Sequence, residues 1–162
     1  MNGKHQVTRT VEVATYPAAI WGVIADSTLL PQWAGVVTDV TYLGEMEEGV
    51  GMTRHCNVEL GGRTGTMTER CVEFVPSRRA AYVVDDDTLG FNRMLLDYGF
   101  TISLDQRSDR TTRLRIDTYY TPRTPLYALL NRLVLQRRMG KLVDGLLQGL
   151  KQISERRSAT AA

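Results

Sequence analysis

Three polar side chains fall within mainly apolar rows of alternating residues, and they are the strongest candidates for chemistry in this sequence. Arg70 alternates with Val72 and Phe74, while Tyr98 and Tyr120 belong to similar rows farther along the chain. Successive side chains of a β-strand point to opposite faces, so each row predicts a shared inward face. An inward arginine could bind a carboxylate or a carbonyl, and the tyrosine hydroxyls could orient a ligand or donate to an enolate.

Each of these side chains also has an ordinary structural explanation. Arg70 could lie near the edge of the interior and pair with another protein group or with solvent, because arginine is seldom buried without a partner. Tyr98 and Tyr120 could be core residues whose hydroxyls reach water. The sequence leaves both interpretations open for all three residues.

Other reactive residue types do not form a recognisable site. A zinc site needs four ligands, and the chain has four histidines and cysteines in total: His5, His55, Cys56 and Cys71. They lack the close sequence pairs of zinc sites, and neighbouring positions on a strand face opposite ways. His55 belongs to the more polar row of its strand, so we expect it to face solvent. Cys71 alternates with Glu69 and Glu73, which makes it a poor candidate for a nucleophile. No phosphate-binding loop or Ser–His–Asp set is recognisable, and the sequence predicts no metal and no cofactor.

These candidates must be positioned by a series of hairpins. Strands are predicted at residues 5–14, 36–44, 52–60, 63–74, 80–84, 93–104 and 111–121. Pro17 and Asp26 mark the starts of two short helices between the first two strands. Pro122 and Pro125 end the strand region, and the rest is predicted helical to about Arg157. Consecutive hairpins followed by a helix indicate an α+β fold with an antiparallel sheet.

The long C-terminal helix is the only predicted element able to cover such a sheet. Its apolar stripe consists of Leu142, Val143, Leu146, Leu147, Leu150 and Ile153. Gly140, Gly145 and Gly149 border this stripe, although each glycine costs a helix about 1 kcal/mol relative to alanine. Either the backbone of the sheet approaches the helix closely there, or the glycines leave space for a ligand.

The beginning of this helical region has a different apolar face. Leu126, Leu129, Leu130 and Leu133 point well away from the later stripe. A straight helix cannot bury both faces against one sheet. We therefore expect a bend around residues 137–140 or an apolar flank that faces a partner, and we favour the bend.

Length and composition are those of an ordinary globular protein. The chain has 162 residues, of which 43% are hydrophobic and 23% charged, and we expect one domain over residues 1–157 with a flexible tail at 158–162. No run of apolar residues is long enough to span a membrane, and no signal peptide precedes the first strand, so a cytoplasmic location is predicted.

Charge is distributed unevenly along the chain. Residues 121–162 contain 8 lysines and arginines but only 2 acidic residues, whereas residues 1–120 contain 12 and 16. The basic segment could contact an acidic partner or a membrane surface, but we favour a solvated helix face. Nucleic-acid binding is not expected, because the chain lacks a basic stripe with interleaved aromatic residues.

The order of elements and four local segments resemble a known superfamily. The segments are "YPAAIWGVIADSTLLPQW" (16–33), "GVG" (49–51), "TERCVEFVPSRRAAY" (68–82) and "TRLRIDTYYTP" (112–122). They are similar to the START/Bet v 1-like (SRPBCC) superfamily, and within it to the bacterial polyketide cyclase/dehydrase and lipid-transport group. The resemblance implies a helix-grip fold, in which a seven-stranded antiparallel sheet wraps around the C-terminal helix and encloses an apolar cavity.

Three functions remain under consideration. The first is binding of a small hydrophobic or aromatic ligand, such as a lipid or polyketide, as a carrier or sensor. The second is a polyketide cyclase/aromatase-like enzyme that uses Arg70, Tyr98 and Tyr120 as polar groups. The third is docking of the basic helical segment on a membrane or protein, and a homodimer is a further alternative. The residues expected to contact the ligand are Trp33, Arg70, Val72, Phe74, Tyr98, Phe100, Ile116, Tyr120, Leu142, Leu146, Gly149 and Leu150.

Overall fold

A single curved antiparallel sheet holds all the strands of the described chain. The computed structural model describes residues 2–160. The strands are β1 (His5–Val13), β2 (Val37–Leu43), β3 (Thr53–Leu60), β4 (Arg63–Val75), β5 (Arg79–Asp87), β6 (Leu95–Ser108) and β7 (Thr111–Pro122). Their order across the sheet is β1-β7-β6-β5-β4-β3-β2, and every neighbouring pair is antiparallel. The predicted α+β fold with seven antiparallel strands is confirmed.

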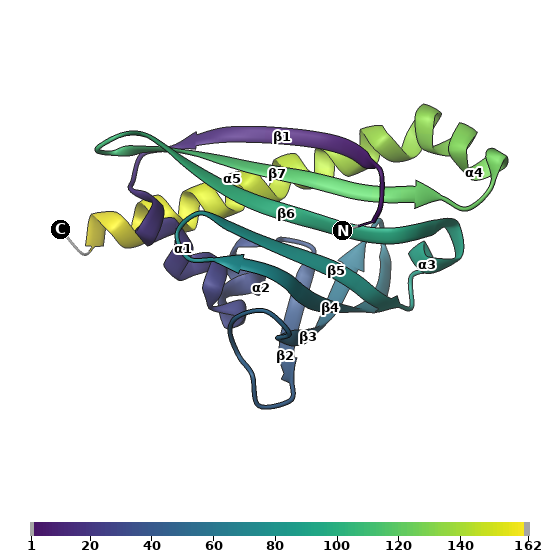
Figure 1. Ribbon diagram of the computed structural model, residues 1–162, viewed down its shortest axis with the longest axis horizontal. Coiled ribbons are helices and arrows are strands. Elements are labelled where there is room, and N and C mark those ends of the chain that lie inside the picture. The colour runs from purple at the N-terminus through teal and green to yellow at the C-terminus, as the bar shows by residue number, and fades with distance from the viewer. Residues whose placement is uncertain (1, 161–162) are drawn as a thin grey trace.

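The helices lie on the inner side of this sheet and at its ends (Figure 1). They are α1 (Pro17–Ala25), a 3₁₀ turn η1 (Ser27–Leu29), α2 (Leu30–Trp33), α3 (Phe91–Met94), α4 (Pro125–Leu130), a π-helical segment η2 (Asn131–Leu135) and α5 (Gln136–Thr160). Helix α5 packs against β1, β7, α1 and α2. Asp26 caps η1, because its side chain accepts a hydrogen bond from the backbone N–H of Thr28 at 3.0 Å.

Some boundary predictions need correction. Helix α5 continues to Thr160, so residues 158–160 are helical rather than part of a flexible tail. Residues 161–162 of that predicted tail lie outside the described residues. Strand β5 extends to Asp87, beyond its predicted end at residue 84, and α3 occupies residues 91–94, so β6 begins at Leu95 rather than at residue 93. The single domain over residues 1–157 stays a prediction. None of the helices within residues 2–160 is long and apolar enough to cross a membrane.

An irregularity in β4 reverses the faces that we predicted for part of this strand. The pairing with β5 shifts between Cys71 and Glu73, so Val72 is an extra residue, a β-bulge. Before the bulge the buried residues are Glu69 and Cys71, and Arg70 is exposed. The predicted inward positions of Arg70 and Val72 are therefore wrong, and Cys71 is buried although it alternates with Glu69 and Glu73. A bulge adds one residue to the alternation, and the row that ends at Phe74 cannot be extended backward through it.

Strand β6 has a comparable irregularity near its start. Its pairing with β7 shifts between Leu96 and Gly99, and Asp97 has a φ of 53°, in the left-handed region. Leu96 is consequently 37% exposed, although simple alternation would place it on the same face as Tyr98, which is buried. Beyond the shift, the predicted alternation of β6 holds.

The glycines of α5 have different roles. A Cβ atom built on Gly149 would overlap the backbone carbonyl of Trp33 in α2, and one on Gly140 would lie 2.5 Å from Nη2 of Arg9. Gly145 has open space around its Cβ position, with no other atom within 4 Å. Close approach of backbone therefore explains Gly149, and that backbone belongs to α2 rather than to the sheet, whereas Gly140 faces only the end of the flexible Arg9 side chain.

The helical region begins with a segment that is not packed into the core. The irregularity expected around residues 137–140 lies earlier, in the π-helical turn Asn131–Leu135, and α5 is continuous from Gln136. A π-helical turn changes the angular position of the residues that follow it, so the two apolar faces point in different directions. Leu126 and Leu129 are 64% and 55% exposed. The apolar flank that we considered less favoured is thus present.

Candidate functional site

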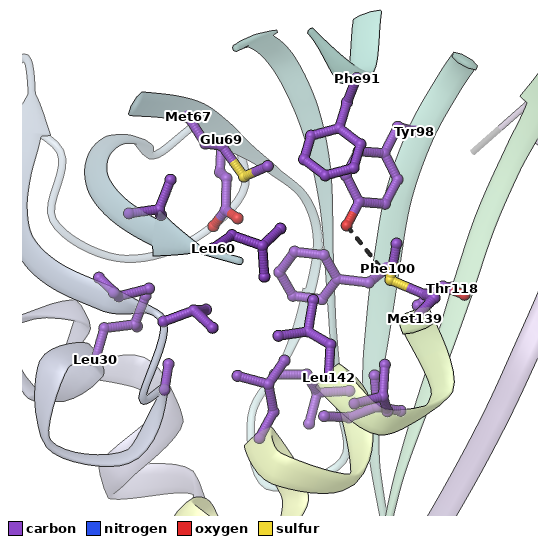
Figure 2. Close-up of a pocket in the computed structure, with 18 of the residues that line it drawn as sticks. Leu30, Leu60, Met67, Glu69, Phe91, Tyr98, Phe100, Thr118, Met139 and Leu142 are labelled. Atoms are coloured by element: carbon purple, nitrogen blue, oxygen red, sulfur yellow. Dashed lines mark hydrogen bonds between the residues drawn. The ribbon is translucent and has the colours of Figure 1, made fainter. Parts of the chain in front are cut away.

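A mainly apolar pocket lies between α5, α2 and the concave face of the sheet. Its volume is about 90 Å³. Its floor and walls come from strands β3, β4, β6 and β7, and α5 covers it with Met139, Leu142, Val143 and Leu146. Figure 2 shows Leu142 on the helix and Phe100 on the sheet pointing toward the same space. Leu60, Met67 and Phe91 are only half-buried, so the pocket opens to the surface beside them.

Half of the residues that we predicted to contact a ligand line this pocket. They are Trp33, Tyr98, Phe100, Ile116, Leu142 and Leu146. Alternation along β6 and β7 correctly predicted that Tyr98, Phe100 and Ile116 face the interior. Leu142 and Leu146 belong to the predicted apolar stripe of α5. Both are half-exposed, and they lie over the pocket.

Arg70 does not enter the pocket. Its guanidinium is exposed and forms a bidentate ion pair with Asp85, with Nε–Oδ2 and Nη2–Oδ1 distances of 2.7 and 2.9 Å. Val72 lies half-buried near this pair. Phe74 does point inward, but its ring contacts that of Trp21 on α1, with centroids 4.9 Å apart. These three residues are not part of the pocket lining.

Tyr120, Gly149 and Leu150 also lie outside the pocket lining. The Tyr120 hydroxyl donates a hydrogen bond to Oδ1 of Asn131 at 2.7 Å and is therefore satisfied within the protein. Burial raises the pKa of Tyr120 to about 12, so its hydroxyl stays protonated. Leu150 is fully buried in the core, and Gly149 meets the backbone of α2. The tightly packed side of α5 is thus separate from the side that covers the pocket.

Sequence reasoning missed a buried ion pair at the pocket wall. Arg54 on β3 lies opposite Glu69 on β4, and the Nη2–Oε2 distance is 2.7 Å. Nη1 of Arg54 donates a hydrogen bond to Oγ of Ser27 at 3.0 Å, and the guanidinium lies 4.3 Å from the ring centroid of Tyr82. Both Arg54 and Glu69 line the pocket.

Electrostatics keeps Arg54 charged in this setting. Burial by itself would lower the pKa of Arg54, but the neighbouring Glu69 carboxylate outweighs that effect and raises the pKa above its ordinary value. The sequence did contain a signal, because Arg54 shares its alternation with Met52, Cys56 and Val58, which are all buried. A charged residue within a buried row predicts a paired charge in the interior.

Tyr98 places a hydroxyl inside the pocket. Its oxygen lies 3.9 Å from Sδ of Met139, the contact drawn in Figure 2. Burial is the largest cause that raises the pKa of Tyr98, and the negative charge of Glu69 adds to it. The hydroxyl therefore stays protonated at neutral pH and can act as a hydrogen-bond donor toward a ligand.

The short helix α3 forms one edge of the pocket opening, and a single carboxylate accepts from the backbone N–H groups at its start. Asp87 accepts hydrogen bonds from the backbone N–H groups of Phe91 at 2.8 Å and Asn92 at 2.7 Å, and also from Gly90. Phe91 in turn packs against Tyr98, with ring centroids 5.9 Å apart. Asp87 thus determines where one aromatic wall of the pocket lies.

Replacing Asp87 with alanine is expected to loosen α3, because three backbone N–H groups lose their acceptor. We expect a loss of about 1–2 kcal/mol in the free energy of unfolding and faster amide hydrogen exchange at residues 90–92. Asp86→Ala is the matched control, since the neighbouring Asp86 is exposed. Unchanged exchange in Asp87→Ala would show that other contacts hold α3.

Comparison with known structures identifies the class of fold. A START superfamily protein from Mycobacterium smegmatis matches with a TM-score of 0.76 and 17% identity, covering 94% of this chain and 98% of the other. The Zhui aromatase/cyclase from Streptomyces sp. R1128 matches with a TM-score of 0.75 and 19% identity, covering 96% and 95%. Norcoclaurine synthase from Thalictrum flavum matches with a TM-score of 0.75 and 12% identity, covering 98% and 99%. The protein has the helix-grip fold of START/Bet v 1-like proteins.

The sequence itself gives the family. Residues 4–155 match the family described as polyketide cyclase/dehydrase and lipid transport. The chain therefore belongs to this family, and the resemblance seen in the four sequence segments is confirmed. No curated protein matches the sequence significantly.

Proposed function

We propose that this protein binds a small, mainly apolar or aromatic molecule in the pocket beneath α5, with a polar group of the ligand near Arg54 and Glu69. The observation that carries the proposal is a buried ion pair in a wall otherwise built from apolar side chains. Ligand sites commonly combine an apolar lining with a few placed polar groups. The polyketide cyclase/dehydrase and lipid transport family is consistent with such a ligand.

The size of the pocket constrains how the ligand sits. Sites for drug-sized molecules have volumes of about 300–1,000 Å³, whereas this pocket has about 90 Å³. The pocket as it stands therefore holds only part of such a ligand. Met67, Leu142 and Leu146 are half-exposed around it, and their flexible side chains can move to admit the remainder.

Unpaired polar atoms in the lining residues support a ligand that is not purely hydrocarbon. Nε1 of Trp33 and Oγ1 of Thr118 are buried and have no hydrogen-bond partner among residues 2–160. Both residues belong to the pocket lining. Buried polar groups are normally satisfied by protein, water or a ligand. A carbonyl or hydroxyl group on the ligand, or a water that accompanies it, would satisfy them.

Filling the pocket should abolish binding without unfolding the protein. Leu142→Trp places a larger side chain over the pocket from a half-exposed position, and we expect ligand uptake to fall by at least about tenfold. Native mass spectrometry after incubation with fatty acids, quinones and aromatic polyketides measures this uptake.

Gln148→Trp is the matched control, because Gln148 is an exposed residue of the same helix. It should bind like the unmodified protein. Equal uptake by Leu142→Trp and the unmodified protein would contradict the proposed site, as would an unmodified protein that takes up none of these compounds.

A cyclase-like enzyme is the second candidate. The observation that favours it is the charged Arg54 and the protonated Tyr98 hydroxyl in one pocket, where they could polarise a carbonyl of a folded polyketide. An intramolecular aldol condensation followed by dehydration forms one C–C bond and releases one water. A released or bound product lighter than the supplied polyketide by one water would therefore support catalysis, and an unchanged mass would favour binding alone.

A further inference from the structure

Helix α4 and the π-helical segment η2 expose a row of large apolar side chains that we call the leucine patch. Its members are between 43% and 64% exposed, and they are Leu126, Leu129, Leu130, Leu133 and Val134. Asn131 is the buried residue of this segment, while none of residues 125–130 is buried. The usual pattern of a surface helix is inverted here, because a polar residue faces the protein and the leucines face outward.

Polar contacts hold the segment in this orientation. Nδ2 of Asn131 donates a hydrogen bond to Oε1 of Gln6 at 3.1 Å, and Oδ1 accepts one from the Tyr120 hydroxyl at 2.7 Å. Gln136 also donates to Oε1 of Gln6, at 3.1 Å. Thr124 caps the start of α4 by accepting from the N–H of Tyr127. The fold thus fixes the leucine patch without burying it.

The charge around the leucine patch has one sign. Residues 118–143 contain no aspartate or glutamate. The cations of this stretch are all exposed, and they are Arg123, Arg132, Arg137, Arg138 and Lys141. None of these five side chains forms a salt bridge within residues 2–160. Exposed leucines flanked by cations that have no salt bridge within residues 2–160 match an interface that is apolar in its centre and anionic around it.

We propose that the leucine patch docks on the surface of a membrane that contains anionic lipids. The leucine side chains would enter the boundary between headgroups and acyl chains, and the arginines would lie at the level of the lipid phosphates. Arginine suits this position because its guanidinium can bind phosphate oxygens in a bidentate manner. This is peripheral docking by one face of a short helical segment.

A second copy of the chain fits the leucine patch less well. A symmetric dimer through this surface would place two sets of cations against each other, and like charges in an interface are unfavourable. The exposed acidic loop with Glu45, Glu47 and Glu48 could attract the cations, but it joins β2 and β3, away from α4 (Figure 1). Such a head-to-tail contact would not close into a dimer.

Docking through the leucine patch would also bring the pocket edge close to the membrane. Arg123, just before α4, is hydrogen-bonded through its backbone N–H to the carbonyl of Met94 at 2.9 Å and through Nε to the carbonyl of Asn92 at 2.8 Å. These contacts join α4 to α3, which carries the pocket residue Phe91. Both helices lie at the same end of the sheet (Figure 1).

Vesicle co-sedimentation tests the docking surface. The probe is phosphatidylcholine vesicles with and without phosphatidylserine, at low and high salt. We expect binding to the phosphatidylserine vesicles at low salt, weaker binding at high salt, and a loss of at least about tenfold in Leu129→Glu/Leu133→Glu. These positions are exposed, so the double variant should fold normally.

The control variant Leu43→Glu/Val50→Glu changes two equally exposed apolar residues around the β2–β3 loop and should bind vesicles like the unmodified protein. The pocket variant Leu142→Trp should also bind vesicles normally, which separates this proposal from the proposed ligand site. No binding at low salt, or an equal loss in the control variant, would overturn the docking surface. A dimer that disappears in Leu129→Glu/Leu133→Glu, without any vesicle binding, would assign the leucine patch to a second copy instead.

Discussion

Replacing Glu69 with alanine is expected to lower the free energy of unfolding by about 3–5 kcal/mol. The substitution leaves the guanidinium of Arg54 buried without its counter-ion, and Arg54 is only 2% exposed. Breaking a buried ion pair on one side costs far more than the pair itself contributes, because the remaining charge stays desolvated. Chemical denaturation followed by tryptophan fluorescence measures the loss.

Two further variants separate burial of charge from loss of contacts. The double variant Arg54→Met/Glu69→Leu removes both charges and should recover most of the stability lost in Glu69→Ala. Arg70→Ala removes the exposed pair with Asp85 and should cost less than about 1 kcal/mol. A small cost for Glu69→Ala, equal to that of Arg70→Ala, would mean that the Arg54–Glu69 pair is solvated in solution.

The same double variant distinguishes stability from recognition. If the proposed function is correct, Arg54→Met/Glu69→Leu folds but loses its preference for ligands that carry a polar group over pure hydrocarbons. A ligand panel read by native mass spectrometry reports this preference. An unchanged preference would show that the ion pair contributes to the pocket wall but not to the choice of ligand.

Gly149→Ala is expected to destabilise the protein by about 1–3 kcal/mol, because the added methyl group overlaps the Trp33 carbonyl and must push α5 away from α2. This effect opposes the intrinsic preference of a helix for alanine over glycine, which favours the substitution by about 1 kcal/mol. Thermal or chemical unfolding measures the difference.

Gly145→Ala is the matched control on the same helix. Open space surrounds its Cβ position, so the substitution should stabilise the protein by up to about 1 kcal/mol. Opposite signs for two glycine substitutions one turn apart would establish close packing at Gly149. If Gly149→Ala instead left stability unchanged, α2 and α5 would have more freedom than their contact indicates.

Alternation and helical periodicity were enough to predict the order of the strands and some of the residues that line the pocket. The rows through Ile116 on β7 and through Phe100 on β6 are regular, and each strand pairs along most of its length without a break. Leu142 and Leu146 followed from the apolar stripe of the long helix. These features depend on local geometry, which the sequence encodes directly.

Arg70 was misplaced because alternation fails at a β-bulge, and nothing in the residues around Val72 marks that extra residue. The pairing with β5 creates the bulge, so it is a property of two strands rather than of one. The alternating row of Arg54 with Met52, Cys56 and Val58 indicated a paired charge in the interior, but the partner could not be identified, because the misplaced face of β4 made Glu69 appear to point outward.

By itself, the sequence determined the antiparallel sheet, the covering helix and a minority of the residues that line the pocket. Only the tertiary structure decided which polar groups enter the pocket, that Gly149 contacts the Trp33 carbonyl, and that the leucine patch stays exposed. Periodicity acts within one segment, whereas a bulge, an ion pair and a helix contact each depend on atoms that come together only after the chain has folded.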